Sequence, residues 1–268
     1  MNYINKEKLI NSLQLGVNEK LRGKIWVLLS CCLHLAVNHS ENFYYKLIES
    51  EEKEIEDTIN KDIERTIIYS YNSQLKNVSQ IDINSNKKKL FNILKAYAIY
   101  DPDVSYVQGT NYVVAVLLNS MNSERASFWT FVKLMSKWRE IYTKDTPRLI
   151  KMLNNLEKIF ETSLPQLYQY FDKIDFLQYF AAVFTQYFVT LFSYNCPIEY
   201  ANRVIDFFWI YEEKIIYDCI IHIFDLQKFI LMQMDIDQLV PYIRDKIVTD
   251  CMNSWGLQGA LPFGIDII

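Results

Sequence analysis

The sequence has few residues that interrupt helices. It contains only six glycines and six prolines among its 268 residues, less than half of their combined share of about 12% in average proteins. No segment alternates apolar and polar residues at period two with turn residues at hairpin spacing, so a β-sheet has little support. Half of the residues are apolar and 15% are aromatic, which is enough to fill a large core. We therefore expect an all-α fold with no sheet.

An excess of positive charge is also missing. The formal net charge is −4, so the chain has no cationic field to attract phosphate backbones, and nucleic acid is not expected as a partner. The five cysteines are an odd number without C-x-x-C spacing, and the N-terminus MNYINKEKLI lacks the apolar run of a signal peptide. These features predict a cytoplasmic protein with reduced thiols.

Uncharged stretches are present, but none has the features of a membrane span. Residues 25–40, 104–123 and 176–198 lack Asp, Glu, Lys and Arg. The last contains Gln178 and Gln186 and has no Lys or Arg cluster at its flanks, so we expect a buried core helix rather than a transmembrane segment. No lipidation motif or basic amphipathic helix is found either. Any association with endomembranes would then be peripheral and would depend on a partner.

The motifs of a self-contained nucleotide, metal or hydrolase site are absent. The sequence has no G-x-x-x-x-G-K-S/T or G-x-G-x-x-G pattern, no H-E-x-x-H and no G-x-S-x-G. Cys31, Cys32 and His34 lie close in sequence, but they lack the second ligand pair of a zinc site. We therefore expect no cofactor and no metal in this chain, and a partner would have to supply any nucleotide.

What the sequence does have is helical patterning. Over residues 41–69 charged residues alternate with apolar residues at close to the i, i+4, i+7 spacing of one amphipathic helix. The Asn-rich and Ser-rich segment 71–89 predicts a solvated loop. A helix over residues 90–100 should stop before Pro102, because the residue before a proline disfavours helical geometry. The apolar runs 112–118 and 176–192 predict buried helices.

Two short signatures stand out in this pattern. INKDIERT contains Asp62 and Arg65, which are three residues apart, so on a helix the carboxylate can hold the guanidinium. YVQGTN contains Gln108 in a polar turn, followed by Gly109, where another backbone can approach. Taken singly, the first is most often a surface ion pair and the second a turn glutamine. Together they supply the arginine and the glutamine that a GTPase active site can borrow from a partner.

The two signatures are part of a longer series of four blocks in order: RGKIW, INKDIERT, YVQGTN, and YFVTLF followed by RVID. These blocks resemble the TBC-domain Rab GTPase-activating proteins, and the likeness runs from about Gly16 to Asp250. The resemblance implies one two-lobed, all-helical TBC-like domain over residues 1–268. Its N-terminal lobe would end near residue 165, and its C-terminal lobe would begin near residue 166.

The same resemblance implies a function in vesicle trafficking. The domain would accelerate GTP hydrolysis by a GTP-bound Rab-family small GTPase through two residues supplied in trans. Arg65 would stabilise the charge of the transition state, and Gln108 would orient the attacking water, while GTP and Mg²⁺ would sit on the partner. Supporting or partner-binding roles would fall on the other matched positions, Asp62, Thr66, Tyr106, Gly109, Asn111 and Asp206.

Several positions depart from the family pattern. Glycine is frequent where this chain has Ser105 and Glu213, methionine where it has Thr110, and tryptophan where it has Tyr187 and Ile205. These substitutions bear on loop conformation and on Rab preference, and they leave both proposed catalytic positions intact.

Two other functions compete with GTPase activation. One is a non-catalytic module that binds GTP-loaded Rab or another small GTPase as an effector or scaffold, and the other is a helical scaffold without a GTPase partner. Modules of the first kind commonly lose the arginine or the glutamine, and this chain retains Arg65 and Gln108. We therefore favour an enzyme activator that has no complete active site of its own.

Overall fold

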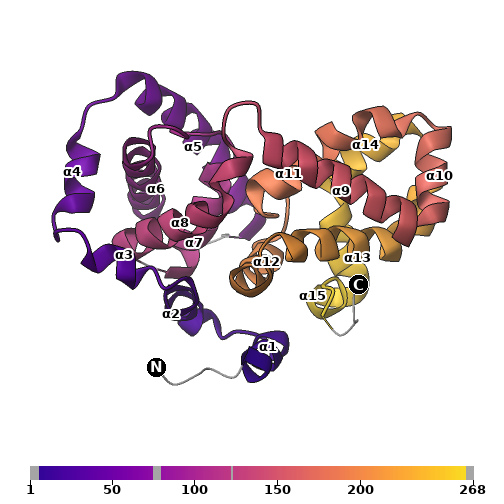
Figure 1. Cartoon of the computed structure of the whole chain (residues 1–268), viewed down its shortest axis with the longest axis horizontal. Helices are drawn as coiled ribbons and strands as arrows, with labels where there is room; N and C mark the ends of the chain where they lie inside the picture. The colour runs from indigo at the N-terminus through magenta and orange to yellow at the C-terminus, as the bar shows by residue number, and fades with distance from the viewer. Residues whose placement is uncertain (1–5, 75–79, 122, 264–268) are drawn as a thin grey trace. The chain divides into compact units, whose positions relative to one another are not determined.

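The computed structural model describes residues 6–74, 80–121 and 123–263, and within these ranges it contains helices and no strand (Figure 1). The expected all-α fold is therefore confirmed. The helices form two compact units. One comprises Lys20–Pro147, and the other comprises residues 6–19 together with residues 148–263.

The helices of the first unit have the following bounds: α2 (Glu19–Ser30), α3 (Leu33–Val37), α4 (Phe43–Glu49), α5 (Lys53–Gln74), α6 (Gln80–Tyr100), α7 (Thr110–Met121), α8 (Glu124–Trp138) and the 3-10 helix η1 (Arg139–Ile141). Those of the second unit are α1 (Lys6–Leu15), α9 (Pro147–Ser163), α10 (Pro165–Lys173), the 3-10 helix η2 (Phe176–Tyr179), α11 (Phe180–Thr190), α12 (Ile198–Tyr211), α13 (Glu213–Leu231), α14 (Ile236–Asp245) and α15 (Ile247–Gly259).

The core of the first unit forms around α6, which packs against α4, α5, α7 and α8. Ile59 and Ile63 on α5 and Leu117 on α7 are buried, and each such side chain stabilises the fold by about 1.5–3 kcal/mol. Gly23 of α2 lies so close to the end of α7 that a Cβ atom there would be 2.7 Å from Met121 Cα. The close approach explains the glycine of the RGKIW block, whose Trp26 is fully buried.

The second unit begins earlier in the chain than the predicted boundary near residue 165. α9 belongs to it, because the Phe160 ring lies 5.2 Å from that of Phe184 and 5.1 Å from that of Phe224, between centroids. α1 belongs to it as well, since Arg203 donates a hydrogen bond to the Leu13 carbonyl. The amphipathic pattern of α9 shows that one face is buried, but it does not show against which helices, so the predicted boundary fell one helix too late.

Two predicted segments differ from the structure in the first unit. The single helix expected over residues 41–69 is two helices, α4 and α5, because the backbone turns to an extended conformation at Ser50. The loop expected over residues 71–89 is largely helical, with α5 continuing to Gln74 and α6 beginning at Gln80, while residues 75–79 lie outside the described part of the chain. Asn and Ser lower helix propensity only weakly, and packing of α5 on α6 outweighs that preference.

The apolar run 176–192 is also divided, into η2 and α11, and it ends where Leu191 adopts a φ of +48°. Most of its aromatic side chains are buried, as predicted, including Phe176, Phe184 and Phe188. Among the residues that the structure describes, no helix has the length and apolar character needed to cross a bilayer. After α15, Leu261 is buried in the second unit, and the Phe263 ring stacks on that of Phe207 with centroids 3.7 Å apart.

Candidate functional site

The first half of the candidate site lies on α5. Asp62, Arg65 and Thr66 are three and four residues apart, so they share one face of the helix. Ile59 and Ile63 bury the adjacent face in the core and fix the rotation of the helix. The Thr66 hydroxyl donates to the Asp62 carbonyl at 2.7 Å. The helix therefore buries the aspartate and the threonine and leaves the arginine at the surface.

Arg65 is held loosely. Its side chain is 69% exposed, and Nη1 lies 3.8 Å from Asp62 Oδ1, beyond hydrogen-bonding distance. The aspartate is different, because only 9% of its side chain is exposed. An exposed pair at this separation contributes less than about 1 kcal/mol. The guanidinium is thus oriented by a fixed carboxylate and can leave it at little cost.

The second half of the site is the loop between α6 and α7, which carries Gln108. Gly109 has a φ of +106°, a conformation that glycine adopts at no steric cost. Its amide donates to Asn111 Oδ1 at 2.8 Å, and the Thr110 hydroxyl donates to the Val107 carbonyl at 2.6 Å. These bonds fix the backbone on both sides of Gln108, where the loop enters α7. The side chain of Gln108 itself is exposed.

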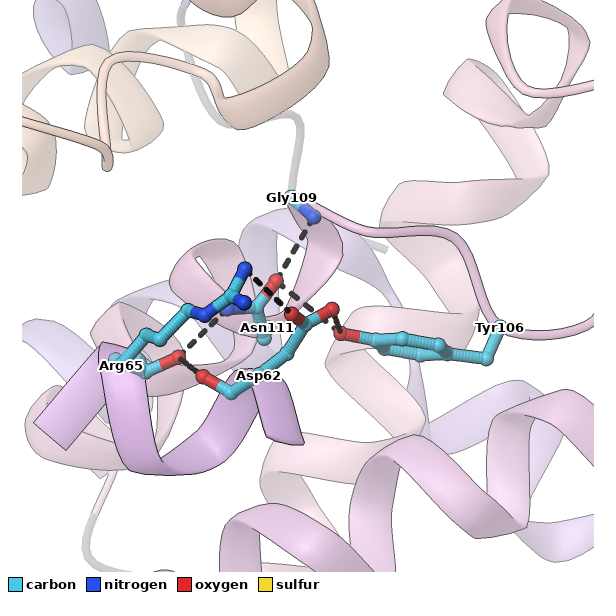
Figure 2. Close-up of polar contacts among 6 residues, drawn as sticks. Asp62, Arg65, Tyr106, Gly109 and Asn111 are labelled. Carbon is cyan, nitrogen blue, oxygen red and sulfur yellow. Dashed lines mark hydrogen bonds and ion pairs between the residues drawn. The ribbon is translucent and has the colours of Figure 1, made fainter. Parts of the chain in front are cut away.

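Two side-chain bonds join the halves (Figure 2). The Tyr106 hydroxyl donates to Asp62 Oδ2 at 2.8 Å, and Asn111 Nδ2 donates to Thr66 Oγ1 at 2.6 Å. Burial, followed by the hydrogen bond to Asp62, raises the pKa of Tyr106 well above its ordinary value, so the hydroxyl remains a donor at neutral pH. Asn111 is almost fully buried. The arginine-bearing helix and the glutamine-bearing loop therefore form one hydrogen-bonded network.

The start of the loop has a separate anchor that the sequence analysis missed. The sequence pattern shows Asp101 only as the residue before Pro102, at the end of a helix. In the structure Arg139 of η1 donates to it twice, from Nε to Oδ2 at 2.8 Å and from Nη2 to Oδ1 at 2.7 Å. Tyr97 of α6 donates to the same carboxylate at 2.9 Å. A separation of 38 positions between the two charged residues left no signal in the sequence that they would meet.

The remaining predicted residue, Asp206, lies in the second unit and outside this network. It is fully buried on α12 and accepts a hydrogen bond from Arg203 at 2.9 Å. Arg203 in turn donates to the Leu13 carbonyl of α1 at 2.6 Å. Asp206 therefore helps to hold α1 on α12, and a role in partner binding stays a prediction.

One departure from the family pattern has a visible geometric context. Ser105 has a φ of +57°, and its amide donates to the Asp101 carbonyl at 2.7 Å. A glycine, the residue that the family resemblance leads us to expect here, would adopt this left-handed conformation without strain.

The profile of the Rab-GTPase-TBC domain matches residues 19–232. The chain belongs to this family. The matched segment contains both halves of the site, and in this TBC domain they come from α5 and from the loop before α7.

Curated relatives and a solved structure agree with that assignment. The domain is 28% identical over 240 residues to the GTPase-activating protein GYP5 of Eremothecium gossypii, which covers 89% of this chain and 27% of the relative. It is 27% identical to GYP5 of Saccharomyces cerevisiae, covering 87% of this chain and 24% of the relative. The chain thus spans about a quarter of the length of these relatives. The Chlamydomonas flagellar RabGAP TBC domain has the same fold, with a TM-score of 0.78 over 97% of this chain and 85% of that chain, at 24% identity.

Proposed function

We propose that this TBC domain is a GTPase-activating protein for a Rab-family small GTPase in its GTP-bound form, and that Arg65 and Gln108 act in trans. The proposal is supported by the family membership and by one observation in particular. A buried network, Tyr106 to Asp62 and Asn111 to Thr66, joins the helix of the arginine to the loop of the glutamine, yet both side chains remain exposed. Such an arrangement suits residues that must enter the active site of another protein.

The chemistry of GTP hydrolysis accounts for the two residue types. Charge spreads over the γ-phosphate oxygens in the transition state, and a guanidinium placed beforehand neutralises it without reorganisation. An amide can donate to and accept from water at the same time, so Gln108 can orient the attacking molecule. GTP and Mg²⁺ belong to the partner in this mechanism, and the TBC domain contributes side chains only.

Asp62 has a defined task in this proposal. Its carboxylate is fixed by Tyr106 and lies near the guanidinium without a tight bond to it. It limits the rotamers of Arg65 before the partner arrives, which reduces the entropy lost when the guanidinium meets the phosphate. Arg65 can still move away, because a pair at 3.8 Å is weak.

The test is phosphate release from a panel of purified GTP-loaded Rab proteins, with and without this domain. We expect at least one Rab to respond. Arginine fingers contribute about 10³ to 10⁵ in kcat, so Arg65→Ala should abolish nearly all of the stimulation, and Gln108→Ala should reduce it strongly. Arg244→Ala and Gln166→Ala are matched controls, because both residues are exposed and lie in the second unit.

Three results would contradict the proposal in different ways. If no Rab responds, or if the two variants stimulate as well as their controls, the catalytic mechanism is wrong. Binding of a GTP-locked Rab without turnover would favour the non-catalytic effector or scaffold. Failure to bind any small GTPase would favour a helical scaffold. Where a Rab responds, recruitment to its endomembrane would follow from that interaction, and a role in vesicle trafficking would follow from the identity of the Rab.

A further inference from the structure

The loop that carries Gln108 is held at two places, and only the second belongs to the network with α5. The first is the Asp101 carboxylate, which receives three hydrogen bonds, two from Arg139 and one from Tyr97. The side chain of Asp101 is 15% exposed, while that of Arg139 is 36% exposed. We call these three residues the loop anchor.

The main chain of Asp101 also takes part in holding the loop. Its carbonyl accepts hydrogen bonds from the amides of Val104 at 3.2 Å and Ser105 at 2.7 Å, and its own amide donates to the Tyr97 carbonyl at 2.9 Å. One residue thus ends α6 and closes the turn that follows it. Because Ser105 is held at a positive φ in this turn, the direction in which the chain leaves toward Gln108 depends on the position of Asp101.

The hydrogen bonds of the loop anchor are strengthened by the opposite charges of Asp101 and Arg139, although both side chains are partly exposed. A guanidinium that meets a carboxylate with two parallel bonds is fixed in angle as well as in distance. Burial raises the pKa of Asp101, but the hydrogen bonds from Arg139 and Tyr97 outweigh it and leave the pKa below its usual value. Asp103 lies 3.6 Å from Arg139 Nη2 and adds a second, exposed carboxylate. At neutral pH the Asp101 carboxylate is therefore ionised, while burial raises the pKa of Tyr97 and keeps its hydroxyl protonated.

We propose that Arg139 is a positioning residue for Gln108, which acts by holding Asp101 and so the turn from which the glutamine loop departs. The inference rests on the proposed function, since it concerns the rate of GTP hydrolysis on a partner. Arg139 touches neither the nucleotide nor Arg65 in this account. Loss of Arg139 should therefore lower kcat and leave KM almost unchanged, because the surface that binds the Rab is retained and only the orientation of Gln108 changes.

The experiment compares Arg139→Gln with Arg244→Gln under single-turnover conditions, using a Rab that responds to the parent domain. Arg244 is a matched control, because it also makes two hydrogen bonds to one carboxylate, at 2.9 and 2.7 Å to Asp245, and lies in the second unit. A misplacement of about 1 Å can cost about 10²-fold in rate, so we expect Arg139→Gln to lower kcat by about 10- to 100-fold. KM should change by less than about twofold, and Arg244→Gln should match the parent.

A double variant separates positioning from a general loss of structure. If Arg139 acts through Gln108, then Arg139→Gln should have little further effect in a Gln108→Ala background. Amide hydrogen exchange supplies a readout that does not require a GTPase. Exchange at Val104 and Ser105 should become about tenfold faster or more in Arg139→Gln, while amides in the interior of α13 keep the parent rates.

The outcomes distinguish this inference from the proposed function. If the parent stimulates a Rab and Arg139→Gln behaves like Arg244→Gln, the positioning role is wrong and the proposed function stands. A loss that is equally large with and without Gln108, or a change in KM alone, also overturns it. If the parent stimulates no Rab, the proposed function has failed, whatever hydrogen exchange shows for the loop.

Discussion

Each unit of the molecule contains an aspartate and an arginine three residues apart on one helix, and the two pairs differ in almost every other respect. Asp62 and Arg65 on α5 are 3.8 Å apart, and the arginine side chain is 69% exposed. Arg203 and Asp206 on α12 are 2.9 Å apart, with side chains 3% and 0% exposed. The order of the residues is reversed between the pairs. The two pairs therefore share their spacing in the sequence, but they differ in burial and in the distance between their charged atoms.

The difference separates a residue that can act on a partner from one that holds the fold together. Arg203 donates to Asp206 and to the Leu13 carbonyl, and it lies against the rings of Phe207 and Phe263 at 5.3 and 5.5 Å. Without Arg203, the buried carboxylate of Asp206 would have no compensating charge. Arg65 has one weak contact and solvent around it. The helical spacing that makes a pair possible does not decide which of the two roles it has.

Removal of Arg203 should produce the largest change in stability. Breaking a buried pair by deleting one partner costs about 3–5 kcal/mol, because the other charge stays buried and uncompensated, so Arg203→Ala should lower the free energy of unfolding by that amount. Urea denaturation followed by circular dichroism measures it. The double variant Arg203→Met with Asp206→Leu should recover part of the loss, since it removes both charges. An unchanged midpoint for Arg203→Ala would mean that the pair is not structural.

The hydrogen-bonded network that joins α5 to the loop of Gln108 can be weakened without changing Asp62 or Arg65. In Asn111→Ala the Gly109 amide and the Thr66 hydroxyl lose their side-chain partner in a buried position, which should cost about 1–3 kcal/mol. Asn154, exposed on α9, supplies the control, and Asn154→Ala should remain within about 0.5 kcal/mol of the parent. If the two variants unfold at the same urea concentration, the network does not hold the loop on α5.

The smallest effect concerns a third aspartate and arginine, Asp101 and Arg139, in which the arginine side chain is 36% exposed, between those of Arg203 and Arg65. The folded pKa of Asp101 lies below the ordinary 3.8. Its contribution to stability is therefore complete above that value and is lost as the pH falls through the lower, folded pKa. Thermal melting of the parent and of Arg139→Gln should differ at pH 7, and the difference should shrink toward pH 2. If the difference in melting temperature between the parent and Arg139→Gln stays constant over this pH range, the ion pair is not its cause.

The sequence was sufficient for the fold class and for most helices, because these depend on local periodicity and on the scarcity of glycine and proline. It failed where the outcome depends on distant contacts. Composition predicts a loop where the structure has helix on both sides of residues 75–79, and the predicted boundary near residue 165 puts α9 in the other unit. The packing partners that decide both cases are distant in the sequence. Both errors concern which surfaces meet, not which segments are amphipathic.

The candidate site shows the same division. The resemblance to the family selected Asp62, Arg65 and the residues around Gln108, and the structure joins most of them in one network. Asn111 and Thr66, which form the bridge between the halves, are 45 positions apart in the sequence. Asp101 and Arg139 of the loop anchor are 38 positions apart. Such pairs could not be predicted from spacing. The exposure of Arg65 and the burial of Arg203 do not follow from the three-residue spacing, because both pairs share it. The signal lies in the neighbours, which are largely charged around Arg65 and largely apolar around Arg203.

The most direct test of the contrast between the two pairs is a pair of measurements on Arg65→Ala: single-turnover GTP hydrolysis by a responsive Rab, and the free energy of unfolding. We expect stimulation by Arg65→Ala to fall by about 10³-fold or more, while its free energy of unfolding stays within about 0.5 kcal/mol of the parent. Full stimulation by Arg65→Ala would contradict it. So would a loss of activity that merely follows a loss of folded protein, because Arg65 would then be a structural residue like Arg203.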